Sequence, residues 1–414
     1  MTATTGYGGY PARPSDLYPI VRGVVDTSGV PEEHKHIFRD FDRNLAEPFQ
    51  GLTTDGVART ELFPLEDTGL DTSELADRAR AFLRTLGEPQ RVRAQLPVDS
   101  DRWRAWINAF APTPPHGVLL DDLSPEQREA AMGMFAEAFS ADGFAQIRTA
   151  MRINGELATI AGGYEDTLRE WMYWVTVFGR PEPGEPWGFQ MYGHHSCVNV
   201  FVLDGQITVG PMFVGTEPRI VARPDGSSLR TFDSELELGM AVMRSLPPEQ
   251  RSQALLAPSM RWADLPPRLA HPTEGRMRGS AARDNAVIPQ EGLSAADMSD
   301  ESRNRLLALL DLYADRLRTP HATLLKERIR RFLPEAHFAW VGDVDIDKPF
   351  YYQVHHPLMF IEVDAHAGIF IANDEAESFH IHNIVRTPNG NDYGFAYLRQ
   401  HNERQAAQQP EPRS

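Results

Sequence analysis

Short hydrophobic stretches separated by turn residues predict several β-strands in this chain. The run Asn199-Val-Phe-Val-Leu ends at Asp204-Gly205, a pair that favours a type I′ hairpin turn, and Gln206-Ile-Thr-Val follows as the partner strand. Further strand-like runs occupy residues 187–193, 338–341, 352–354, 360–364 and 379–385. Because turns separate most of these runs, we expect an antiparallel sheet and not alternating βαβ units.

Several helix starts are followed by helical periodicity. Residues 86–91, 123–128 and 246–251 are spelled alike; Ser124 can cap the second helix, and Gln127 can close a capping box. After Ser124, and again after the looser start at Ser299, apolar residues recur on one helical face. We therefore predict an α+β fold with helices packed on one or two antiparallel β-sheets.

The order of these patterns suggests two degenerate α+β halves. Residues 117–128 align with residues 292–303 through Gly, Asp, Ser, Glu and Arg in register, although generic capping residues can also recur by chance. Aligning Gln190 with Gln353 places Asn199 opposite Glu362, near a pseudo-twofold axis.

We predict four segments from these patterns. The first half would span 31–230, and the second, with the histidine- and glutamate-rich strands, would span 231–404. Residues 1–30, rich in Gly, Pro, Ser and Thr, predict a disordered or surface-strapping arm, and residues 405–414 predict a disordered tail. The arm could strap a homodimer together.

Composition and charge narrow the class of protein. The 414 residues are 41% hydrophobic and 24% charged, which is typical of a globular protein, and the formal net charge of -17 disfavours nucleic acids and anionic membranes as partners. The sequence predicts neither a transmembrane helix nor a secretory signal, so we expect a cytoplasmic protein. Cys197 is the single cysteine, which excludes an internal disulfide and a cysteine-based zinc cage.

Histidines in strand contexts are the strongest chemical signal. His380 and His382 are two residues apart, so on a strand both imidazoles point to one side, with Ile384 and Arg386 continuing that side. Two imidazoles from one strand are half of a usual zinc or iron site, although a solvated polar strand face would show the same pattern. His194 and His195 follow Gly193, and one of them could complete the site or be hydrogen-bonded in the core.

Acidic and basic residues on the same strands are candidates for catalysis. Glu362 directly follows the apolar run Leu-Met-Phe-Ile, where a carboxylate needs a cation, a metal or a proton. Asp364 and His366 continue its alternation, although most such runs simply expose a polar face. Arg386 could hold a substrate carboxylate, and Asp392 could cap a turn or brace Arg386.

Further residues are candidates for lining a substrate pocket. Asn199 lies inside an apolar strand, and His355 stands before Pro357, which favours the edge of a strand. Trp340 and Tyr352 could line the pocket, although aromatic residues on strands more often belong to the core.

These motifs together resemble the uncharacterised family "domain of unknown function 3500". The resemblance covers roughly residues 73–404 and rests on Trp187-Gly-Phe-Gln-Met-Tyr-Gly-His-His195, Ile361-Glu362 and His380-Ile-His-Asn-Ile-Val-Arg386. It implies a shared fold and a shared site built from the His-His, Glu and His-x-His motifs, and it implies no activity. His356-Pro357 departs from the Gly-Pro that is usual in the family, which adds a ligand or reshapes a turn.

The sequence favours a metal-dependent enzyme that acts on a small polar molecule. His194 or His195, His380, His382 and Glu362 would hold a divalent ion, zinc ahead of iron or manganese, and Glu362 or Asp364 would be the base in hydrolase or lyase chemistry. The alternatives are a non-heme iron oxygenase, a metal-free acid–base enzyme and a non-catalytic binding protein for small ligands. A single metal requires the imidazoles of His195, His380 and His382 to lie within about 8 Å of one another.

Overall fold

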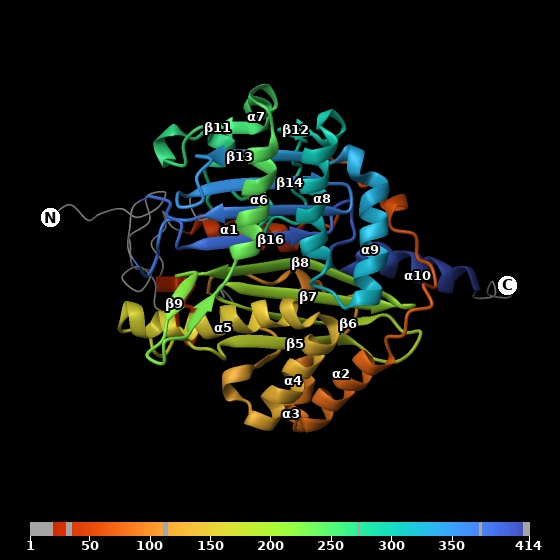
Figure 1. The fold of residues 1–414 in the computed structure, drawn as a ribbon. Coiled ribbons are helices and arrows are strands. Elements are labelled where there is room, and N and C mark those ends of the chain that lie inside the picture. Colours follow the sequence, from red (N-terminus) through yellow and green to blue (C-terminus); the bar gives the residue numbers. More distant parts are fainter. Residues whose placement is uncertain (1–19, 30–34, 111–114, 272–273, 372–374, 409–414) are drawn as a thin grey trace.

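One large β-sheet runs through the described part of the chain, residues 20–29, 35–110, 115–271, 274–371 and 375–408, in this computed structural model (Figure 1). Its strand order is β11-β13-β14-β15-β16-β8-β7-β6-β5-β3, with β12 paired to β13 and β4 paired to β5. Neighbouring strands are antiparallel except for the pairs β11–β13 and β3–β5. The predicted α+β fold is therefore confirmed, with one principal sheet.

The described strands and helices have the following bounds. The strands are β1 (Ile20–Val21), β2 (Val24–Val25), β3 (Gln95–Leu96), β4 (Val118–Leu119), β5 (Tyr173–Gly179), β6 (Trp187–Gly193), β7 (Ser196–Leu203), β8 (Gln206–Thr216), β9 (Ile220–Ala222), β10 (Ser228–Arg230), β11 (Leu255–Ala257), β12 (Leu293–Ser294), β13 (His337–Gly342), β14 (Phe350–His356), β15 (Met359–Ala365) and β16 (Ile381–Arg386). The helices are α1 (His36–Ala46), α2 (Ser73–Thr85), α3 (Glu88–Ala94), α4 (Pro125–Ala138), α5 (Ala141–Ala161), α6 (Asp233–Ser245), α7 (Pro248–Ala254), α8 (Asp300–Ala314), α9 (Thr319–Phe332) and α10 (Phe395–Gln408).

The same order of elements occurs twice along the chain. Two helices, two short strands, two further helices and four long strands run from α2 to β8 and again from α6 to β16. Strands β8 and β16 pair in the middle of the sheet, so both sets of strands share one sheet. The register also repeats, because Gln190 pairs with Asn199 and Gln353 pairs with Glu362. Asn199 and Glu362 do not meet near the axis as expected, because β8 and β16 lie between their strands.

Local capping chemistry begins the helices where the sequence predicts. The Ser124 hydroxyl accepts a hydrogen bond from the backbone N–H of Gln127, and the Gln127 side chain accepts from the N–H of Ser124. Ser299 caps α8 through the N–H of Ser302. Asp204 and Gly205 both have positive φ and connect β7 to β8, as the hairpin prediction requires.

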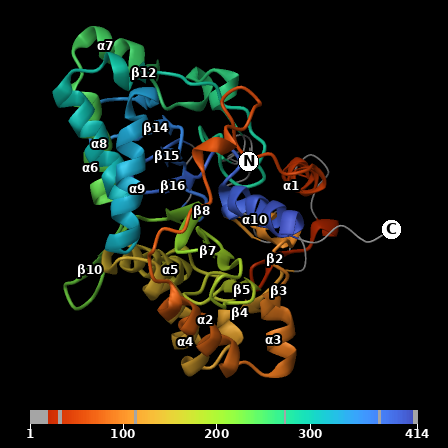
Figure 2. The same ribbon diagram turned by 90° about the vertical axis from the view of Figure 1, so that its right-hand side faces the viewer.

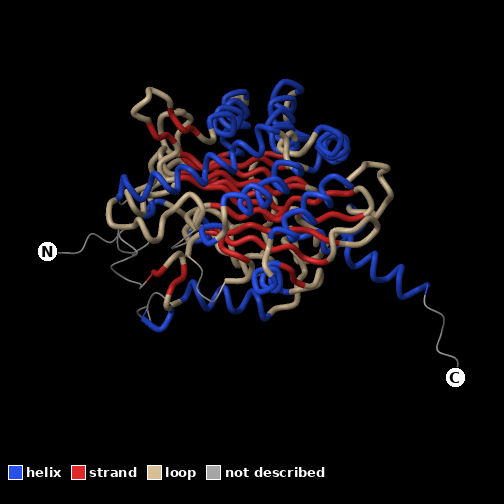
Figure 3. The backbone as a smooth tube through the Cα atoms, turned by 90° about the horizontal axis from the view of Figure 1, so that it is seen from below, coloured by secondary structure: helices blue, strands red, loops and turns tan. Residues whose placement is uncertain are grey.

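The two faces of the sheet differ in character. Helices α2, α4, α6 and α8 cover one face, where a large apolar core contains Phe135, Met151 and Leu309 (Figures 1 and 2). The opposite face carries buried polar side chains from the central strands and is covered by α10 and by loops (Figure 2). Figure 3 shows the strands as a continuous band through the molecule. The candidate chemistry lies mainly on this polar face.

The ends of the described chain differ in part from the expectation. α10 continues to Gln408, so residues 405–408 are helical and not disordered. The predicted arm lies mostly outside the described residues, and residues 20–25 within it form the β1–β2 hairpin. Among the described helices, none has the length and apolar character needed to cross a membrane.

Candidate metal centre

Three histidine side chains converge at one end of the central strands. The Nε2 atom of His380 lies 2.9 Å from Nε2 of His382 and 3.2 Å from Nε2 of His195. One nitrogen from each ring can be chosen so that all three lie within 4.8 Å of one another. The predicted convergence is therefore present, well within the limit for a single metal ion.

Strand order brings the three residues together. His382 lies on β16, His380 immediately precedes β16, and the β6–β7 turn carries His195, which has φ of 64°. β8 lies between β16 and β7 in the sheet, and its Gly215 donates a backbone hydrogen bond of 2.7 Å to the His195 carbonyl oxygen. The turn therefore places the His195 ring over β8, toward His380 and His382.

Gly215 makes the room that these imidazoles occupy. A Cβ atom at this position would lie 2.8 Å from Cδ2 of His382 and 3.2 Å from Cδ2 of His195. Both distances are shorter than an ordinary carbon–carbon contact. The arrangement of the rings therefore depends on a residue without a side chain at position 215.

A backbone carbonyl orients His380 for ligation. Its Nδ1 atom lies 2.7 Å from the carbonyl oxygen of Ala367, which can only accept a hydrogen bond. Nδ1 therefore carries the proton in the neutral ring, and the lone pair of Nε2 faces the other two histidines. A hydrogen bond of this kind, behind the ligating nitrogen, is typical of metal-bound histidines.

Burial keeps the rings of His195 and His382 uncharged. His195, His380 and His382 are all buried, and burial together with the neighbouring histidines holds the pKa of His195 and His382 well below the ordinary value. Neutral imidazole is the form that binds a metal.

His194 faces away from the converging rings. Its Nδ1 atom lies 2.6 Å from Oδ1 of Asn154, and its ring stacks between Phe110 and His195. Burial lowers its pKa to about 3. Of the two adjacent histidines, His195 points into the cluster, and His194 supports it from behind.

A buried Arg–Asp–His series lies beside the cluster. Asp364 pairs across the sheet with His382, and its Oδ2 atom is 3.1 Å from Nη2 of Arg276 and 3.0 Å from Nε2 of His366. The His366 ring lies 4.0 Å from the His382 ring, measured between centroids. Burial alone would raise the pKa of Asp364, but Arg276 and His366 outweigh it and lower that pKa. Asp364 thus stays ionised next to the cluster.

Glu217 is a buried carboxylate that the sequence analysis missed. Its Oε1 atom accepts hydrogen bonds from three consecutive backbone N–H groups, those of residues 369–371, at 2.7, 2.9 and 2.7 Å. Its Oε2 atom lies 3.9 Å from Nδ1 of His380 and has no hydrogen-bond partner among the described residues. Glu217 therefore anchors the loop before His380 and adds negative charge behind that ring.

Glu362 does not join the histidines. Its carboxylate accepts from the backbone N–H groups of Arg278 and Gly279, each at 2.8 Å, and from the Tyr351 hydroxyl at 2.8 Å. Burial raises its pKa despite these bonds. The sequence predicts a cation, a metal or a proton beside this carboxylate, whereas the structure shows the N–H groups of a loop and a tyrosine hydroxyl.

Arg386 and Asp392 belong to a buried ion network. Arg386 lies 2.8 Å from Asp392 and 2.9 Å from Asp284, and Asp284 also lies 2.8 Å from Arg104. Asp392 braces Arg386 as one of the sequence hypotheses states, and burial raises its pKa to about 6. Since Arg386 is four residues along β16 from His382, about 13 Å away, its guanidinium is not placed to hold a substrate at the histidines.

The four predicted pocket residues lie away from the histidines. Asn199 accepts from Gln190 at 2.6 Å and donates to the Pro211 carbonyl, and His355 contacts Thr54 and Phe360. Tyr352 and Trp340 point to the helix-covered face, where the Tyr352 hydroxyl meets that of Tyr313 at 2.9 Å. These strands are buried on both faces, so alternation in the sequence does not reveal which side chains meet the histidines.

Comparison with known protein families identifies the family of this chain. The family model described as "Protein of unknown function (DUF3500)" matches residues 68–395, a stretch that includes His195, His380 and His382. No curated protein and no solved structure matches the chain.

Proposed function

Since the chain belongs to the DUF3500 family of proteins of unknown function, we propose an activity from its own site: a metal-dependent enzyme in which His195, His380 and His382 hold one divalent ion. The observation that carries this proposal is the convergence of three Nε2 atoms, two pairs of them 2.9 and 3.2 Å apart. In tetrahedral zinc, with Zn–N bonds of about 2.0–2.1 Å, ligand nitrogens lie about 3.3 Å apart.

Chemistry also favours a metal over three bare imidazoles. Because the Nδ1 proton of His380 faces Ala367, its Nε2 has a lone pair directed at two further imidazole nitrogens. A buried polar group of this kind is costly unless it is satisfied, and one cation satisfies all three nitrogens together.

The ligand set favours zinc over iron. The group contains three histidines and no carboxylate among the described residues, whereas the common non-heme iron site uses two histidines and one carboxylate. Three histidines with a fourth position for water or substrate is the arrangement of a catalytic zinc site.

Hydrolase or lyase chemistry fits the surroundings of this site. A zinc ion bound here would acidify a water molecule and make it a nucleophile or base near neutral pH. His366 is the nearest candidate to accept its proton, since its ring lies next to His382 and Asp364 holds its Nε2. Asp364 would act as a positioning residue, and Glu362 has no part in this proposal.

Elemental analysis of the purified chain tests the metal. We expect close to one zinc per chain in the wild type and loss of that zinc in His380→Ala/His382→Ala. His355→Ala is the matched control, because His355 is also buried on a strand but contacts Thr54 and Phe360 instead of the cluster. A wild-type chain that stays metal-free after reconstitution with zinc, iron and manganese would overturn the proposal.

A second measurement separates the chemical classes. The reconstituted protein is assayed against panels of esters, amides, phosphoesters and dehydratable hydroxy acids, with and without a chelator. Turnover that requires zinc supports the proposal. Oxygen consumption with iron, and no zinc-dependent turnover, would replace it with the oxygenase alternative.

A further inference from the structure

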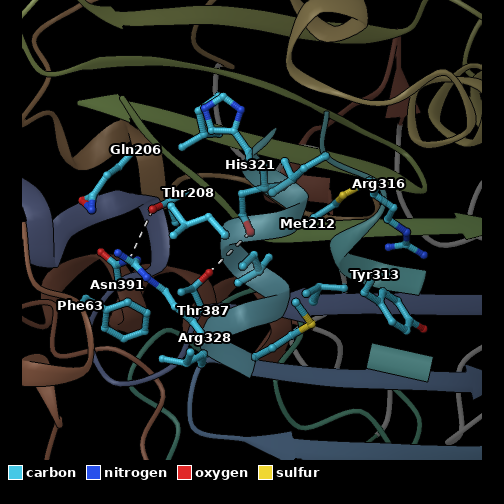
Figure 4. A pocket seen from close by; sticks show the side chains of 18 of the residues that line it. Phe63, Gln206, Thr208, Met212, Tyr313, Arg316, His321, Arg328, Thr387 and Asn391 are labelled. Atoms are coloured by element: carbon cyan, nitrogen blue, oxygen red, sulfur yellow. Dashed lines mark hydrogen bonds between the residues drawn. The ribbon is translucent and has the colours of Figure 1, made fainter. Parts of the chain in front are cut away.

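A pocket lies at the opposite end of β8 and β16 from the histidine cluster (Figure 4). It has a cavity volume of about 90 Å³ and lies between α9, the start of β8 and the residues after β16. Apolar side chains such as Met212, Leu325 and Leu358 form much of its wall. Figure 4 shows Gln206, Thr208 and Asn391 together at one end and Arg316 and Tyr313 at the other.

This pocket occupies the position in the first half that the histidines occupy in the second. The cross-strand pair Gln190–Asn199 in the first half corresponds to Gln353–Glu362 in the second. The next pair on the same face is Phe201–Thr208 in the first half and Asp364–His382 in the second.

The following pair completes the correspondence. Leu203 pairs with Gln206 in the first half, and the N–H of His366 donates to the His380 carbonyl oxygen in the second. His195 lies five residues after Gln190, and Leu358 lies five residues after Gln353, so these two residues also correspond. The equivalents of His195, His380 and His382 are therefore Leu358, Gln206 and Thr208, and all three line the pocket.

Two buried oxygen atoms in this pocket lack a donor. Gln206 and Asn391 are 3% and 1% exposed, and neither Oε1 of Gln206 nor Oδ1 of Asn391 has a hydrogen-bond partner among the described residues. Their amide nitrogens are engaged, with the Pro64 carbonyl at 3.3 Å and the Thr208 hydroxyl at 3.4 Å. A buried acceptor without a donor is costly, so these two atoms call for O–H or N–H groups from a ligand.

The arginines of the pocket are already neutralised. Arg316 pairs with Glu235 at 2.7 Å, Arg328 with Glu66 at 3.7 Å, and Arg386 with Asp284 and Asp392. Each positive charge therefore has an acidic partner, which favours an uncharged ligand, and Nη1 of Arg316 remains a buried donor without a hydrogen-bond partner among the described residues.

We propose that this pocket binds an uncharged small molecule with an apolar ring and two hydroxyl groups. The hydroxyls donate to Oε1 of Gln206 and Oδ1 of Asn391, and the ring packs on the apolar wall near Leu358. The fold thus uses equivalent positions for two purposes, metal ligation in one half and binding of a hydroxylated ligand in the other. This proposal is independent of the metal and of the reaction.

A pair of matched probes tests the proposal by calorimetry and ligand-observed NMR on the full chain. Resorcinol offers two hydroxyl donors on an apolar ring, whereas 1,3-dimethoxybenzene has the same ring without donors. We expect resorcinol to bind and 1,3-dimethoxybenzene to bind at least tenfold more weakly. Gln206→Met removes one acceptor and should weaken resorcinol about tenfold, the value of one hydrogen bond.

Two further variants locate the binding. Gln250→Met is the same substitution outside the pocket and should leave resorcinol binding unchanged. His380→Ala/His382→Ala should also leave it unchanged. Loss of binding in the histidine variant would place resorcinol at the histidine cluster and overturn the proposal. Equal binding of both probes, no binding of resorcinol, or full affinity in a Gln206→Met chain with wild-type Tm would overturn it as well.

Discussion

Replacement of Gly215 by alanine should weaken metal binding without changing any ligand. The new methyl group would lie 2.8 Å from Cδ2 of His382, whereas carbon atoms in contact are about 3.5–4.0 Å apart. The His382 ring therefore has to move by roughly 0.7 Å or more, or the strand has to shift with it. Gly215 does not have a positive φ, so alanine brings no backbone strain that would confuse the result.

A displacement of this size is large for a metal site. Ligand distances in functional sites are held to within about 0.2 Å, and changes behind the ligands typically lower metal affinity about 10–100-fold. We expect a loss of zinc affinity in that range, measured by competition with a chromophoric chelator. Overpacking should also lower the free energy of unfolding by about 1–3 kcal/mol.

The control is Gly239→Ala, which brings a methyl group against an aromatic ring on the other face of the sheet. There the Cβ would clash with Cε1 of Tyr352, whose side chain belongs to the apolar core under the helices. This variant should lose stability and keep its zinc affinity. If Gly215→Ala binds zinc as tightly as the wild type, then the packing of His382 against β8 does not position the ligands, and the reasoning fails.

Three further predictions follow from other buried groups. Glu217→Gln keeps an acceptor for the N–H groups of residues 369–371 but removes the charge behind His380. Zinc affinity should therefore fall about tenfold in the same chelator titration, while Tm changes little. An unchanged affinity would show that the charge has no influence on His380. His356 is held neutral, with Nε2 donating to the Ile329 carbonyl and Nδ1 accepting from the N–H of Leu358, and burial lowers its pKa to about 4. The stability that neutral His356 contributes is therefore complete above pH 6.5, and about 3 kcal/mol of unfolding free energy is lost as the pH falls from 6.5 toward 4. His356→Asn should lack this loss in urea unfolding, and an identical pH profile in the two proteins would contradict the assignment. Arg386→Leu leaves Asp392 and Asp284 without a principal partner and should cost about 3–5 kcal/mol of stability. A variant that unfolds like the wild type would show that the network is not needed, and loss of zinc from a folded variant would show that Arg386 supports the histidine cluster.

Local features of the fold could be predicted because they depend on neighbours in the sequence. The Ser124 capping box needs residues three apart, and the Asp204-Gly205 turn needs a conformation that two residues allow. The same holds for the histidines of β16, because side chains two apart on a strand share a face whatever lies around them. His380 and His382 were therefore correctly placed on one side of their strand.

Partners that are distant in the sequence could not be predicted. The apolar run before Glu362 predicts that this carboxylate is buried beside a cation, a metal or a proton, but the N–H groups that contact it come from Arg278 and Gly279, more than 80 residues earlier in the chain. Arg386 was assigned to a substrate because Asp284, which neutralises it, lies 102 residues earlier. Such interactions depend on which loop covers the polar face of the sheet.

The α+β class, the likeness of the two halves and the shared strand face of two histidines all follow from the order of residues along the chain. The identity of the third histidine, His195, depends on the fold, because the order of β16, β8 and β7 brings a turn 185 residues away onto His380. The fold also places position 215, which lacks a side chain, where the rings need room. The physical reason is that secondary structure follows from short-range sterics and hydrogen bonding, whereas a site of converging side chains depends on strand order and on packing between segments far apart in the chain.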